Sequence, residues 1–192
     1  MKKLAVVVLC LVVLVCAVAC SSPAPNSTEE PDLAVYSIFY YLDGGEVEAP
    51  NPASYNSLTP TFTLSAAARK GYRFIGWSRS SDLSDPELPA VVEKGTTGNL
   101  SFYAVYVELY SIRVDSAAPE FYTVEYVSGP VAYGETATVR IYTAEPVSSL
   151  EWWGIGTSWQ APDECEYDDA LGCFVARFVL TKNATVMVAA VQ

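Results

Sequence analysis

The residues from Tyr36 to Asp43 alternate between two sides of the chain, which is the period of a β-strand. One side carries Tyr36, Ile38, Tyr40 and Leu42, and the other carries Ser37, Phe39, Tyr41 and Asp43. Gly44 and Gly45 follow, and paired glycines allow the positive φ of a tight reversal. The pattern therefore predicts a first strand that ends in a turn.

Two further segments rich in aromatic residues, 71–77 and 100–107, predict strands. Three prolines interrupt residues 46–61, so this segment is expected to form a connection. One helical turn over 52–56 stays open as an alternative. Because the apolar side of the strands is dominated by rings, we expect an aromatic core.

The order and spacing of these segments resemble the internalin B-repeat, a module of bacterial surface proteins. The matching motifs are Tyr36 to Gly45, Asn51-Pro52-Ala-Ser-Tyr55, Phe62-Thr-Leu64, Gly71-Tyr-x-Phe-x-Gly-Trp77, Gly95-x-Thr97-Gly98-Asn99 and Phe102-Tyr-Ala104. Tyr106 departs from the family, which usually ends in Trp, but another bulky aromatic residue still closes the core. The resemblance implies a β-grasp-like fold for residues 35–109, an adhesive, spacer or partner-binding role, and no catalytic chemistry.

Alternating strands bounded by turn residues start again at Tyr110, which predicts a second small β domain over residues 110–192. This half is similar to the divergent B-repeats, through less specific motifs, and an immunoglobulin-like sandwich is the alternative. The chain is therefore expected to be mainly β, as two tandem small β domains. An α+β class remains open.

The N-terminus has the pattern of an export signal. Two lysines precede an apolar run over residues 4–19, which is short for a membrane span. Small residues directly before Cys20 resemble the lipobox of bacterial lipoproteins, which implies that residues 1–19 are removed and that lipid on Cys20 anchors the chain to a membrane. An ordinary signal peptide cut after Ala19 is the alternative.

Residues 20–34 contain three prolines and few large apolar groups, so we expect a disordered tether between the lipid and the first domain. The residue after Cys20 is Ser21 and not the Asp that favours inner-membrane retention. The expected location is therefore the outer membrane or the cell surface.

The charge balance is strongly acidic. After removal of the signal, 9 Lys and Arg face 22 Asp and Glu, a net charge of 9 − 22 = −13. Nucleic acid and anionic lipid surfaces are disfavoured as partners because they would be repelled. Solubility of an exported protein explains such a surface, and a basic partner is the alternative.

Five cysteines are present, of which Cys10 and Cys16 lie in the signal and Cys20 is the expected lipid site. The remaining pair, Cys165 and Cys173, predicts a disulfide in an oxidising compartment.

The chain has no histidine, so the commonest general base and zinc ligand is missing. Two acidic loops remain, one with Asp82, Asp85 and Glu87 and one over 163–169, and neither has the spacing of a calcium loop. Calcium binding and solvated loops are both kept as explanations. We predict no catalytic residue, no metal site and no cofactor.

The candidate binding residues are the aromatic side chains Phe39, Tyr41, Trp153 and Trp159. Adjacent Trp152 and Trp153 must point to opposite sides of a strand, so at least one is partly exposed. Exposed rings suit protein contacts and sugar faces, and a place in the core is the third explanation. We expect a non-catalytic surface lipoprotein acting in adhesion or protein contact, with carbohydrate binding as the alternative.

Overall fold

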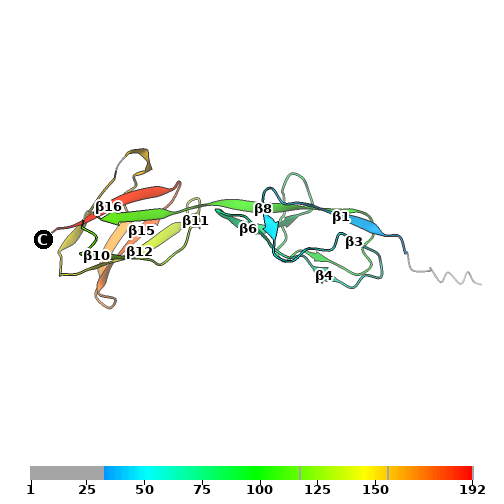
Figure 1. Ribbon diagram of the computed structural model, residues 1–192, viewed down its shortest axis with the longest axis horizontal. Helices are drawn as coiled ribbons and strands as arrows, with labels where there is room; N and C mark the ends of the chain where they lie inside the picture. Colours follow the sequence, from blue (N-terminus) through cyan, green and yellow to red (C-terminus); the bar gives the residue numbers. More distant parts are fainter. Residues whose placement is uncertain (1–32, 117, 155, 192) are drawn as a thin grey trace, which may run out of the picture. The chain divides into compact units, whose positions relative to one another are not determined.

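The computed structural model describes residues 33–116, 118–154 and 156–191, which are drawn in colour in Figure 1. Contacts group residues 33–192 into one compact unit. Almost all regular structure in the described ranges is β-strand. Their single helical element is a 3-10 turn, η1 (Gly156–Ser158). The prediction of a mainly β protein is confirmed.

Strand β8 (Leu100–Tyr110) organises the first half of the chain. It pairs in parallel with β1 (Tyr36–Tyr41) over residues 100–103 and antiparallel with β6 (Tyr72–Ser78) over residues 103–108. Two short antiparallel pairs complete this half: β2 (Glu46–Val47) with β5 (Ala67–Ala68), and β4 (Phe62–Thr63) with β7 (Val91–Val92).

The helical turn considered for 52–56 is wrong, because this segment contains β3 (Ser54–Tyr55), which pairs antiparallel with β1. Tyr55 explains the extended conformation. Its ring is buried in the core, and its hydroxyl donates a hydrogen bond of 2.5 Å to the carbonyl oxygen of Gly98. The burial of the Tyr55 ring and its hydrogen bond to Gly98 together outweigh the local tendency of residues 52–56 to form a turn.

The core of this half is aromatic, as the sequence predicts, and it is centred on Trp77, which is 1% exposed. The rings of Tyr40, Phe74 and Phe102 meet the indole edge to face, with centroids 5.7, 5.5 and 6.4 Å away. Such pairs contribute beyond the area they bury. The indole N–H donates to the carbonyl oxygen of Ser65 at 3.1 Å, so the one polar atom of the ring is satisfied.

Gly76 allows the backbone of Glu87 to lie directly against β6 beside Trp77. The backbones of Trp77 and Glu87 exchange hydrogen bonds of 3.0 and 2.9 Å. A β-carbon on Gly76, whose φ is +153°, would lie 2.6 Å from the carbonyl oxygen of Glu87. This approach is shorter than any real contact, and the obstacle is backbone. The glycine of the Gly-Trp motif is therefore required by the return of the 79–90 loop.

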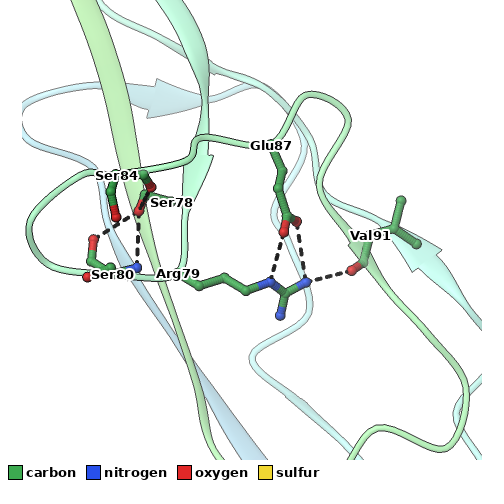
Figure 2. A network of polar contacts seen from close by, with 6 residues as sticks. All are labelled: Ser78, Arg79, Ser80, Ser84, Glu87 and Val91. Carbon is green, nitrogen blue, oxygen red and sulfur yellow. Dashed lines mark hydrogen bonds and ion pairs between the residues drawn. The ribbon is translucent and has the colours of Figure 1, made fainter.

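Figure 2 shows how polar groups hold this loop. The Arg79 guanidinium donates to the Glu87 carboxylate at 3.3 Å and to the carbonyl oxygen of Val91 at 2.8 Å. Ser78, which is fully buried, places its hydroxyl 2.6 Å from the carbonyl oxygen of Ser84 and 3.0 Å from that of Ser80. Ser78 of β6 thus holds the first part of the loop, and Arg79 joins the start of the loop to Glu87 and to β7.

The second half contains two sheets. One has the order β10-β12-β15-β14 and the other has the order β13-β16-β9. The strands are β9 (Ile112–Ser116), β10 (Tyr122–Tyr126), β12 (Thr136–Thr143), β13 (Ser149–Trp153), β14 (Glu164–Asp168), β15 (Cys173–Val179) and β16 (Ala184–Val191). The short strand β11 (Val131–Ala132) pairs with the end of β8.

Each half has its own hydrophobic cluster, and the two clusters have no residue in common. The cluster of the second half is aliphatic, with Val139, Ile141, Val186 and Val188 fully buried around Phe178. A domain boundary between residues 109 and 110 stays a prediction, because residues 33–192 form a single compact unit.

The two halves close in the same way. In each, the first strand pairs in parallel with the last: β1 with β8, and β9 with β16. The Asn99 side-chain oxygen accepts the Ser37 backbone N–H at 2.8 Å, and the Asn183 oxygen accepts the Ser111 N–H at 2.9 Å. In both cases a Tyr-Ser-Ile sequence supplies the donor, and the asparagine directly precedes the closing strand.

We expect Asn99→Ala and Asn183→Ala to destabilise their halves to a similar degree, by about 0.5–1.5 kcal/mol, because each removes the acceptor of a solvent-exposed backbone hydrogen bond. Urea unfolding measures the loss. Asn99→Asp and Asn183→Asp are the controls, since they keep a side-chain oxygen at the same position. Alanine variants as stable as the parent would contradict the role of this asparagine.

An ion pair links β6 to the turn after β11. Arg73 donates two hydrogen bonds to the carboxylate of Glu135, one of them 2.9 Å long, and the same carboxylate accepts the Ala132 backbone N–H at 3.0 Å. The Arg73 guanidinium, followed by the Ala132 N–H, lowers the pKa of Glu135 to about 2. The pair is partly solvent-exposed, so its contribution to stability is small.

A lowered carboxylate pKa adds stability above the ordinary value of 4.5 and loses it as the pH falls toward about 2. We therefore expect Glu135→Gln to unfold at lower urea concentration than the parent at pH 7, with the difference shrinking between pH 4.5 and 2. Glu120→Gln, which removes a surface carboxylate outside the described ion pairs, is the control. A difference that does not change with pH would contradict this assignment.

Candidate functional site

The outer side of β1 carries two of the predicted binding residues, Phe39 and Tyr41, which are 49% and 50% exposed. The parallel register places Tyr41 opposite Tyr103 of β8. Their rings are stacked, with centroids 4.5 Å apart and an interplanar angle of 6°. We call Phe39, Tyr41 and Tyr103 the Tyr41 face. Its rings lie outside the first core, because their strand neighbours point inward.

Trp152 and Trp153 point to opposite sides of β13, as the alternation predicts. Trp152 is half-buried and meets Phe178 edge to face, with centroids 5.6 Å apart. Trp153 lies on the outer side, opposite Met187 of β16, and is 37% exposed. The core and the surface therefore each receive one of the adjacent indoles.

Trp159 is 40% exposed and packs against Gly154. A β-carbon on Gly154 would lie 1.5 Å from Cδ1 of this indole, so the ring rests directly on the backbone. The segment is also held by Gln160, whose side-chain amide donates to the Val179 carbonyl oxygen at 2.8 Å. Trp159 is thus fixed by a local contact with the backbone that follows β13.

The predicted disulfide between Cys165 and Cys173 is not formed, and both thiols are free. The register of the β14–β15 hairpin explains the difference. Cys165 lies opposite Ala176, whereas Cys173 lies opposite Asp168, three residues further along. An odd offset puts the two side chains on opposite faces of the sheet. Burial raises the pKa of the Cys165 thiol, which makes it less reactive.

The acidic loops use their carboxylates to hold turns. Hydrogen bonds from Ser84 lower the pKa of Asp82 to about 2, and Asp168 accepts the backbone N–H groups of Ala170 and Leu171 at 2.9 and 3.0 Å. In the part of the chain that the structure describes, no group of three or more His, Cys, Asp or Glu side chains could hold a metal ion.

An open groove of about 520 Å³ lies beside the connection between β12 and β13. Its lining includes Glu145, Tyr167 and Phe174, but neither Trp153 nor Trp159. The exposed indoles are therefore not beside this concave surface. They and the Tyr41 face are displayed on the outside of sheets and turns.

The structure also adds residues that sequence reasoning missed. Tyr103 joins Tyr41 only through the parallel register, and Met187 and Asp115 join Trp153 in the same way. The alternation of each strand marks these side chains as outward-facing. It does not say which strands become neighbours.

Two predicted features lie outside the described residues: the signal over 1–19, and Cys20 with most of the tether over 20–34. Among the residues that are described, no helix has the length and apolar character needed to cross a membrane.

Comparison with protein families matches residues 36–105 to the model of the Listeria-Bacteroides repeat domain. The matched segment contains the Tyr41 face, Gly76 and Trp77, and it ends within β8. The match is to a bacterial surface repeat, which suggests a protein-interaction role at the cell surface. No curated protein and no solved structure matches the chain.

Proposed function

We propose that the chain is a non-catalytic lipoprotein of the bacterial cell surface that contacts another protein through its exposed aromatic faces. The observation that carries this proposal is the Tyr41 face. Stacked, half-exposed rings on the open side of a sheet suit the flat surface of a protein, and aromatic residues are enriched in such contacts. A sugar ligand would favour rings beside a groove with convergent polar groups.

We further propose that the second half is a divergent copy of the first. Both begin with Tyr-Ser-Ile, both pair their first and last strands in parallel, and both close with an asparagine that accepts the serine N–H. The immunoglobulin-like alternative offers no reason for this shared side-chain contact. Two such copies would act as a spacer that presents the binding faces away from the membrane.

The Tyr41 face is tested with immobilised residues 33–192, which contain both hydrophobic clusters, against purified envelope and host surface proteins and a glycan array. We expect saturable binding to a protein that weakens roughly tenfold or more, about 1.4 kcal/mol, in the Phe39→Ser/Tyr41→Ser variant. Leu58→Ser, which changes a similarly exposed apolar residue, is the control. Saturable binding to one polysaccharide, lost with Trp159→Ala, would overturn the proposal in favour of carbohydrate binding.

The lipid anchor is tested by mass spectrometry of the membrane fraction. We expect the mature chain to begin at an acylated Cys20 and Cys20→Ala to lose both the acyl mass and its membrane association, because several buried acyl chains are needed for durable anchoring. Cys16→Ala, another cysteine of the apolar run, is the matched control. An unmodified chain cut after Ala19 would refute the anchor.

A further inference from the structure

The outer side of the β13-β16-β9 sheet forms a second surface of different chemistry. The register aligns Trp153 of β13, Met187 of β16 and Asp115 of β9 in one row across the three strands. Glu151 lies two residues from Trp153 on the same side of β13, opposite Ala189. We call Trp153, Met187, Ala189, Glu151 and Asp115 the Trp153 face. It combines an exposed indole and apolar side chains with two carboxylates.

The outward side of the other sheet in this half is different, because two of its carboxylates are paired with arginines within the protein. Arg140 binds Glu125 at 3.2 Å, and Arg177 binds Glu164 at 3.1 Å. The Tyr142 hydroxyl also donates to Glu125, at 3.0 Å. These side chains satisfy one another, whereas Glu166 on β14 is exposed and has no such pair among the described residues.

The Trp153 face keeps an unpaired charge. Glu151 is exposed, and among the described residues its side chain makes neither an ion pair nor a hydrogen bond. Asp115 is paired with Arg113 at 2.9 Å, but both groups remain accessible to solvent. The Glu151 carboxylate, beside the exposed indole of Trp153, is therefore available to bind a cation of a partner.

The net charge of this half indicates that a partner would carry positive charge. Residues 110–192 contain four basic and eleven acidic residues, a net charge of 4 − 11 = −7. All three arginines are in ion pairs, and the Lys182 ammonium donates to the Thr157 carbonyl oxygen at 2.5 Å. Of the remaining carboxylates, Glu135 is paired with Arg73, and the excess negative charge of the others attracts basic surfaces over long range.

We propose that the Trp153 face docks an extended, arginine- or lysine-bearing segment of a partner protein. A guanidinium lying over the Trp153 ring gains cation–π attraction and can bond the Glu151 carboxylate at the same time. Met187 and Ala189 supply the apolar floor for the aliphatic part of such a side chain. This inference rests on the proposed protein-binding function and adds the chemistry of a second partner surface.

The test uses residues 33–192 and three synthetic peptides, (Arg-Ser)5, (Lys-Ser)5 and (Glu-Ser)5, with binding followed by calorimetry at low and physiological salt. We expect the two basic peptides to bind, arginine more tightly, and the acidic peptide not to bind. Trp153→Leu keeps apolar volume without a π face and should weaken binding roughly tenfold, whereas Trp153→Phe should retain part of it. Unfolding midpoints of the variants show whether they remain folded.

Glu151→Gln should weaken binding about threefold or more and reduce its salt dependence. Glu166→Gln, which removes a carboxylate from the other sheet, should leave binding unchanged and is the matched control. Equal losses in both glutamine variants would show unspecific charge attraction and overturn the inference, as would absence of binding by either basic peptide. Neither result affects the Tyr41 face, whose partner is measured with a separate variant.

Discussion

The parallel pairing of the first strand with the last strand in each half is the constraint on which the rest of the structure depends. Parallel neighbours cannot be joined by a tight turn, so all intervening residues must form the connection. The asparagine contacts that fix this pairing join residues 62 and 72 positions apart. Closing such long loops costs chain entropy, which the cores enclosed by the connections must offset.

The two halves meet this cost with different cores. In the first half, rings around Trp77 contribute large buried areas in a segment that has only short strands beside β1, β6 and β8. Its loops must therefore pass close to the rings, and Gly76 lets the Glu87 backbone do so. In the second half, longer strands pair in regular hydrogen-bonded ladders and bury aliphatic side chains between them.

The sequence predicts what depends on local alternation and fails where register decides. Period-two patterning identified β1 and placed Trp152 and Trp153 on opposite sides. It also marked Phe39 and Tyr41 as outward-facing. Spacing alone suggested a disulfide, but the hairpin register separates Cys165 from Cys173 by an odd offset. The stacking of Tyr41 on Tyr103 likewise depends on a parallel pairing between segments about 60 residues apart, which no local pattern contains.

The two exposed aromatic faces differ in the charge beside them, and this difference bears on how such a chain would bind. The Tyr41 face is uncharged on its paired strands, since Ser101 and Tyr103 lie opposite Phe39 and Tyr41. The Trp153 face has one carboxylate within its row, Asp115, and another, Glu151, two residues from Trp153 on β13. Apolar burial changes little with salt, whereas attraction between exposed charges is screened beyond about 8 Å at physiological ionic strength. Contacts through the first face should therefore depend on shape, and contacts through the second on shape and partner charge together.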